Sequence, residues 1–238
     1  MSLVALGIRT AYLLDAFSVP DPVDVFSRVI IQLPSEIPLF ESVLHVYEPS
    51  SEQSFLINVP LFRRACQGGE GFAPDQAENT SFISLNETPT RLSKAPDDLR
   101  RVLNGLSESF AATSDPSIPL PTGLTQQTVI PLAAVLLEYP VAYVPISAYQ
   151  TDFLSSIPLT VYECTLRFNG RDAATGSNSH CILKFSCPTM IEDQFHFLSP
   201  SELTPKLAEH FRRRIVEADL SASVQVKYHV ETHDRVAL

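Results

Sequence analysis

Apolar residues recur in steps of three and four at several places in the chain, and this spacing predicts helices. One helix begins after Asp21, a good N-cap, and ends before Pro34, because proline removes a hydrogen-bond donor. A second begins near Pro96 and ends near Phe110. A third begins at Ser199, whose position before a proline and three residues before a glutamate matches a capping box.

Strict alternation of apolar and polar residues predicts strands in the last third of the chain, at 158–168, 180–187 and 223–230. The first two are joined by a polar loop and form an antiparallel hairpin. Shorter apolar runs predict strands at 8–14, 43–47 and 54–59. This order of elements predicts an α+β fold: a mixed sheet with a helical layer, followed by a C-terminal antiparallel hairpin–helix–strand unit.

The most apolar stretch, residues 128–149, carries Glu138 near its middle. A carboxylate there, together with three prolines, excludes a membrane span, which needs about 20 uninterrupted apolar residues. The stretch instead predicts a helix at 131–139 that leads into a buried strand at 141–144. Glu138 at the helix end is expected to reach solvent; a buried Glu138 with a partner would be a sign of a site.

Length and composition predict a single domain over residues 1–238. The 45% of hydrophobic residues suffice for a large core. Two segments do not fit regular elements: a long loop at 63–95, with one candidate short strand at 81–85, and a connection rich in proline and serine at 112–127.

Charge limits the partners. The formal net charge is -10, from 27 acidic and 17 basic residues, so the average field repels nucleic acid and anionic membranes. The N-terminus lacks the basic region of a signal peptide, which predicts a cytoplasmic or nuclear protein.

The four cysteines are candidates for a metal site in the hairpin. Pairing of the strands about the middle of their loop places Cys164 opposite Cys181, with His180 next to it. No C-x-x-C motif is present, and residues 180 and 181 point to opposite faces of the sheet. Packing as small hydrophobic residues is therefore favoured over a metal-stabilised hairpin, and the sequence predicts neither metal nor cofactor.

A few polar residues are candidates for chemistry. Asp15 follows a buried strand, where it can act in a site or simply end the strand. Arg63 and Arg64, with the glycines at 68, 69 and 71, can hold an anion, although the pattern is neither a P-loop nor G-x-G-x-x-G. A solvated loop is the simpler interpretation of that segment.

Three segments carry a family resemblance: LGIRTAYLLDAF at 6–17, IPLAAVLLEYPVAYV at 130–144, and IPLTVYECTLRF with ILKFSCP between 157 and 188. They resemble the uncharacterised eukaryotic family typified by the product of human chromosome 1 open reading frame 74. The resemblance implies one conserved type of domain, and it implies no activity, cofactor or catalytic residue.

Two functional hypotheses follow. The first is a non-catalytic domain that acts as a scaffold or binds another protein, based on the acidic surface and the absence of a recognisable catalytic motif. The alternative is an enzyme of unrecognised class whose site gathers Asp15 with the loops at 63–71 and 145–152; Glu138 is a second candidate for a catalytic group.

Overall fold

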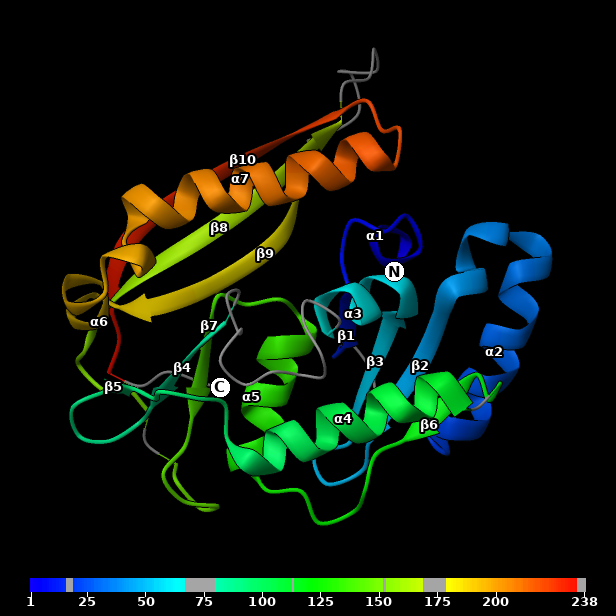
Figure 1. Ribbon diagram of the computed structural model, residues 1–238, viewed down its shortest axis with the longest axis horizontal. Helices are drawn as coiled ribbons and strands as arrows, with labels where there is room; N and C mark the ends of the chain where they lie inside the picture. Colours follow the sequence, from blue (N-terminus) through cyan, green and yellow to red (C-terminus); the bar gives the residue numbers. More distant parts are fainter. Residues whose placement is uncertain (16–18, 67–79, 113, 152, 169–178, 235–238) are drawn as a thin grey trace. The chain divides into compact units, whose positions relative to one another are not determined.

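The computed structural model describes residues 1–15, 19–66, 80–112, 114–151, 153–168 and 179–234 (Figure 1). The chain divides into two compact units. The first unit contains Met1–Ser84 and Leu92–Gln150, and the second contains Leu85–Arg91 and Thr151–Leu238. Helices combine with mixed and antiparallel sheets, which confirms the predicted α+β fold. That the whole chain folds as a single domain stays a prediction.

The first unit is built on a mixed four-stranded sheet in the order β1-β3-β2-β6. Its strands are β1 (Ala11–Leu14), β2 (Val43–Glu48), β3 (Gln53–Asn58) and β6 (Ser117–Pro119). β3 pairs antiparallel with both neighbours, and β2 pairs parallel with β6. β6 lies inside the segment that the sequence presents only as a connection, because three residues are too few for a periodic signal.

Each face of this sheet is covered by helices. On one face, Phe26 and Ile30 of α2 (Pro22–Glu36) pack against Leu56 of the sheet. The short elements α1 (Ser2–Ala5) and η1 (Pro38–Ser42) complete this small core.

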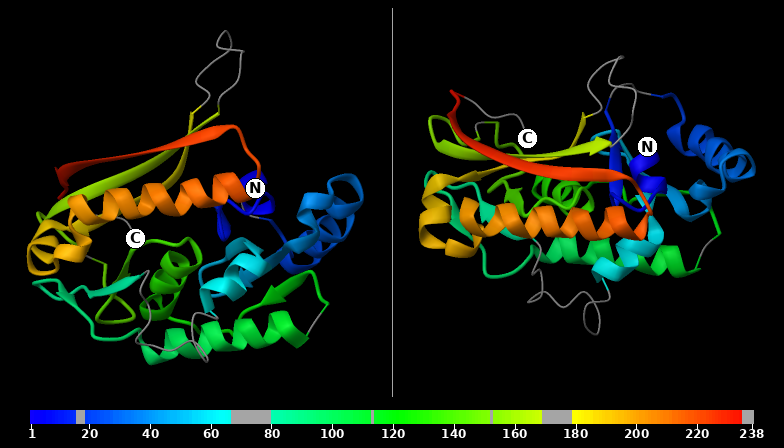
Figure 2. Two further views of the ribbon diagram at one scale, coloured as in Figure 1. Left: turned by 45° about the horizontal axis from the view of Figure 1, so that its top comes forward. Right: turned by 90° about the horizontal axis from the view of Figure 1, so that it is seen from above.

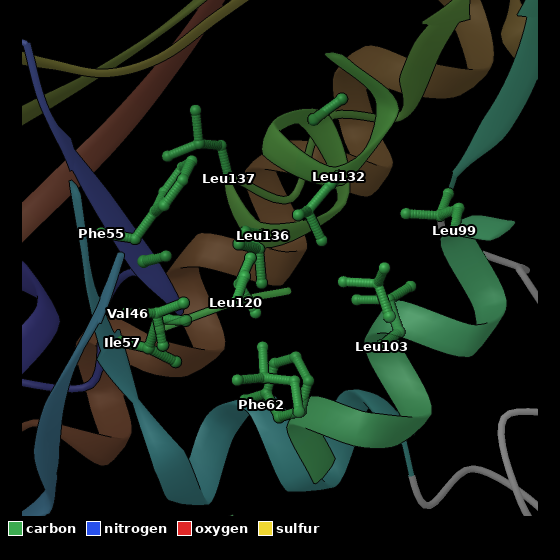
Figure 3. Close-up of a cluster of buried hydrophobic side chains, with 14 of the residues drawn as sticks. Val46, Phe55, Ile57, Phe62, Leu99, Leu103, Leu120, Leu132, Leu136 and Leu137 are labelled. Carbon is green, nitrogen blue, oxygen red and sulfur yellow. The ribbon is translucent and has the colours of Figure 1, made fainter. Parts of the chain in front are cut away.

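The opposite face carries the larger core. It is covered by α3 (Val59–Cys66), α4 (Asp97–Ala112) and α5 (Gln126–Leu136). Figure 3 shows side chains from the sheet and these helices that meet there, among them Val46, Phe55, Ile57, Phe62, Leu99, Leu103, Leu132 and Leu136. The same unit contains a parallel pair formed by β4 (Ser81–Ser84) and β7 (Val141–Val144).

The second unit is a three-stranded antiparallel sheet in the order β10-β8-β9 (Figure 2). Its strands are β8 (Pro158–Phe168), β9 (Ser179–Pro188) and β10 (Ala222–Thr232), and its helices are α6 (Thr189–Gln194), η3 (His196–Leu198) and α7 (Pro200–Glu217). The short strand β5 (Thr90–Arg91) also belongs to this unit. α7 buries one side through Leu203, Leu207, Phe211 and Ile215. The predicted hairpin–helix–strand unit is therefore present.

Three predicted helix ends are wrong, and proline explains two of them. α2 continues through Pro34 to Glu36, and α5 begins at Gln126, so that Pro131 lies inside it. The third is the end of α5, which lies at Leu136 rather than at 139. A proline removes one backbone bond, and burial of the helix face can offset that loss. The predicted start of α2 is correct, with Asp21 as the N-cap and Pro22 as the first residue, although Asp21 is in left-handed geometry and its side chain makes no capping bond.

Two strand and loop predictions also need correction. The predicted loop at 63–95 begins later, because α3 extends to Cys66, and the segment also contains β5; residues 67–79 lie outside the described residues. The candidate strand at 81–85 is present as β4. Cys164 lies opposite Leu183, not Cys181, because Thr165 faces Cys181 next to the loop and the register shifts by one further residue between Cys164 and Thr165. An irregularity of this kind leaves no trace in an alternating pattern.

Candidate functional site

The structure does not collect the residues that the sequence proposes for chemistry into one described cavity. Asp15 is exposed at the end of β1. Arg63 is half-buried, and its Nη2 donates to the carbonyl oxygen of Phe110 at 2.5 Å, which ties α3 to α4. Arg64 is exposed on α3, and the three glycines of the proposed anion loop lie outside the described residues.

Glu138 has a structural explanation. It is half-buried, and it adopts a left-handed φ of 59° directly after α5, which ends the helix. Its Oε2 accepts a hydrogen bond from the backbone N–H of Thr10 at 3.0 Å. Nearby, Nη2 of Arg9 donates to the carbonyl oxygen of Leu137 at 2.9 Å. These bonds tie the end of α5 to the beginning of β1. The Glu138 carboxylate, expected to face solvent, therefore links these two elements.

A cavity of about 1040 Å³ lies in the first unit, between the N-terminal part of α2 and one end of the sheet. Tyr47 and Ser54 lie opposite each other on β2 and β3 and contribute to its wall. Its described lining is Leu14, Val19, Pro20, Asp21, Pro22, Val23, Asp24, Phe26, Ser27, Tyr47, Glu52 and Ser54. The three carboxylates give it an acidic character, although Asp24 is paired with Arg28 at 2.9 Å.

A buried histidine lies on the same face of the sheet. His45 is fully buried, its Nδ1 is 2.6 Å from Oγ of Ser117, and its ring centroid is 4.4 Å from that of Phe26. Burial lowers the pKa of His45 to about 4, so the ring is neutral at pH 7. A histidine and a serine in contact resemble a base and a nucleophile, but both are buried and no third group orients the ring among the described residues. The pair is therefore part of the core.

A second buried polar cluster connects β8 to α6. Oγ1 of Thr160 donates to Oε2 of Glu192 at 2.7 Å, and the hydroxyl of Tyr162 is 2.8 Å from Oε1 of Glu192. The same hydroxyl is 3.1 Å from the carbonyl oxygen of Leu198. Thr160, Tyr162 and Glu192 are all buried, so every one of these groups depends on its protein partners.

The hydrogen bonds of this cluster favour a protonated Glu192. The tyrosine hydroxyl has one hydrogen and two acceptors within reach. If Glu192 carries its proton, it donates to Oη of Tyr162, the phenol donates to Leu198, and every hydrogen is used once. Burial raises the pKa of Glu192, which also favours the protonated form. Burial also raises the pKa of the Cys187 thiol.

Sequence reasoning does not find this cluster. Tyr162 is part of the alternating pattern and looks like an ordinary core residue, while α6 is too short to show a helical period. The only available signal is a glutamate that follows a buried strand closely. Because its members are buried and bonded to one another, the cluster fits a role in holding α6 against the sheet.

The long strand β10 has no fully buried residue. Among the described strands it pairs with β8 alone, so its other edge is open. Two large apolar side chains lie on it, Tyr228 with 54% and Val230 with 60% of their surface exposed. On the other face, Glu231 contacts the imidazoles of both His229 and His233, and these bonds lower the pKa of Glu231. We call this outer edge, residues 222–232, the β10 edge.

Within the described part of the chain, no group of three or more histidine, cysteine, aspartate or glutamate residues can hold a metal ion. The described helices are all too short or too polar to cross a membrane.

The fold and these features define an α+β protein with an open sheet edge and enclosed polar clusters. The chain belongs to the family described as a domain of unknown function, DUF4504, whose model matches residues 2–233. No curated protein matches the chain. No solved structure matches it either.

Proposed function

We propose that this chain is a non-catalytic domain that binds other proteins through the β10 edge. The observation that carries the proposal is an eleven-residue edge strand, Ala222–Thr232, whose outer side has no described strand beside it. Every second residue of an edge strand directs its backbone N–H and C=O groups outward, where they form a template for another strand. An added strand gains main-chain hydrogen bonds along the whole edge.

The β10 edge has few of the features that keep an edge strand from pairing. It contains no proline, and its pairing with β8 runs from Ala222 to Thr232 without a shift in register. The basic residues of the strand are Lys227 and His229. Exposed Tyr228 and Val230 add an apolar contact next to the open backbone groups. Natural proteins usually protect long edges, so an unprotected one indicates a binding surface.

The enzyme alternative is supported by the cavity beside Tyr47 and Ser54, whose size suits a small molecule. The candidate groups Asp15, Arg63 and Glu138 are not in its described lining. The buried His45 is neutral at pH 7, and both His45 and Glu192 have structural partners. The exposed side chains and open backbone groups of the β10 edge therefore support protein binding better than the cavity supports catalysis.

We also infer a cytoplasmic or nuclear location, supported by the free thiols of Cys164, Cys181 and Cys187 among the described residues. Within the DUF4504 family, we assign the chain to the group typified by the product of human chromosome 1 open reading frame 74. The three apolar segments at 6–17, 130–144 and 157–188 support this finer assignment.

The proposal is tested by a charge placed on the β10 edge. We expect Val230→Glu to weaken capture of partner proteins from native extract at least tenfold, because a carboxylate would be buried against the added strand. Val216→Glu on α7 is the matched control, since Val216 is 72% exposed in the same unit. Capture is quantified from the amounts of each bound protein, and both variants should keep the melting temperature of the wild type.

Two results would overturn the proposal. One is that Val230→Glu retains the same partners as Val216→Glu. The other is that the wild type elutes alone while a panel of metabolites raises its melting temperature, which would favour the enzyme alternative.

A further inference from the structure

We infer that a second copy of this chain occupies the β10 edge, paired antiparallel about a two-fold axis through His229. The inference rests on the proposed function and goes further, because it names the partner and the register. Two identical strands can add to each other edge to edge, and a two-fold axis closes the assembly as a dimer. The two sheets then form one continuous sheet of six strands.

The register follows from the symmetry. With a two-fold axis through residue 229, the numbers of two residues that face each other across the axis add up to 458. Lys227 then lies opposite Glu231 of the second copy, and this pair occurs twice. Facing residues have numbers that are both odd or both even, so their side chains lie on the same face of the combined sheet. The neighbouring axis, through Tyr228, instead places Lys227 opposite His229 of the second copy and forms no such pair.

Charge complementarity selects the axis through His229. Within one chain, Lys184 on β9 lies opposite Glu163 on β8, which lies opposite Lys227 on β10. This row alternates in sign, and it ends at the open edge on a positive charge. Glu231 of a second copy continues the alternation. Glu231 contacts His229 and His233 of its own chain but lies opposite the apolar Leu159 in its own sheet, so a lysine from the second copy adds a cross-strand cation.

The apolar face of the strand fits the same register. Tyr228 lies opposite Val230 of the second copy, and the pair again occurs twice. Val224 and Val226, on the same face, are half-buried, whereas Tyr228 and Val230 are exposed. The packing that covers the first part of β10 therefore leaves the second part open. An aromatic residue opposite a β-branched one is a favourable cross-strand pair.

Net charge acts against this association. Each chain carries a formal charge of -10, so two copies repel each other at long range. The two lysine–glutamate pairs lie at the interface, where attraction acts over a few ångströms and is less screened. Reversing one member of the pair adds repulsion at two positions in the dimer, and its effect is expected to be large.

The test uses sedimentation of the full chain over a range of concentrations, with Lys227→Glu and Glu231→Lys. We expect the wild type to dimerise, and each single variant to dimerise at least tenfold more weakly. Mixing the two variants should restore dimers, because each copy then offers the charge that the other needs. The double variant should also dimerise by itself. Glu231→Lys faces Leu159, so it avoids the contact with Glu163 that Lys227→Glu acquires.

The outcomes separate this inference from the proposed function. A wild type that stays monomeric, or a mixture of variants that fails to restore dimers, would overturn the inference. If the wild type is monomeric while Val230→Glu still abolishes capture of other proteins, the β10 edge binds a different partner and the proposed function stands. If the wild type dimerises and Val230→Glu leaves both dimerisation and capture unchanged, both proposals fail.

Discussion

Replacement of Tyr162 by alanine should lower the free energy of unfolding by about 3–5 kcal/mol. The side chain is completely buried, and its ring stacks on that of Phe185 with centroids 4.8 Å apart and planes 5° apart. The substitution leaves a cavity and also removes the hydroxyl that satisfies Glu192 and the carbonyl of Leu198. Both losses act in the same direction.

Denaturant unfolding followed by circular dichroism measures this effect, and two variants serve as controls. Tyr149→Ala removes the same atoms from a residue that is 91% exposed, so a change within about 0.5 kcal/mol is expected. Glu192→Gln mimics the protonated carboxyl, because its amide can donate to Tyr162 while its oxygen accepts from Thr160, and should cost less than about 1.5 kcal/mol. A large loss in Glu192→Gln would show that Glu192 is ionised in the folded chain.

Acid should destabilise the first unit through His45, by about 3 kcal/mol between pH 6.5 and pH 4. Burial lowers the pKa of this ring from 6.5 to about 4, so the folded chain takes up its proton later than the unfolded chain does. The resulting stability is complete above pH 6.5 and is lost as the pH falls through 4. The ring faces Phe26 and Ser117, neither of which titrates in this range.

The free energy of unfolding at a series of pH values, compared between wild type and His45→Gln, isolates this contribution. The variant should be less stable at pH 7, because the amide replaces a ring that packs on Phe26, yet its stability should fall less toward pH 4. His180→Gln is the control, since His180 is exposed and its loss should leave the slope unchanged. Equal slopes in wild type and His45→Gln would contradict the account.

The elements with long, regular patterns could be predicted from the sequence. The five apolar residues of α4 recur at helical spacing and are all buried, and the strands β8, β9 and β10 alternate over eight or more residues. In such a pattern, many residues independently indicate the same element. Single-residue signals were less informative: Pro34 and Pro131 did not end or begin a helix, because the packed faces of α2 and α5 offset one missing backbone bond.

The polar clusters could not be predicted, because they depend on contacts between residues far apart in the sequence. Tyr162 and Glu192 are thirty positions apart, and His45 and Ser117 are seventy-two apart. Glu138 could be recognised as unusual, but not as the partner of Thr10. The β10 edge was visible only as a half-exposed strand, since no sequence pattern states which strand lies at the edge of a sheet.

Binding of another strand to the β10 edge is measured most directly by amide hydrogen exchange along β10, compared between concentrated and dilute protein. If the β10 edge binds a second strand, the amides that point away from β8 should exchange more slowly in the associated state. The slowed amides should then be those of every second residue within 222–232, while those of β9 stay unchanged. The account is contradicted if association leaves the β10 amides unaffected and protects the residues around the cavity, such as Tyr47 and Ser54.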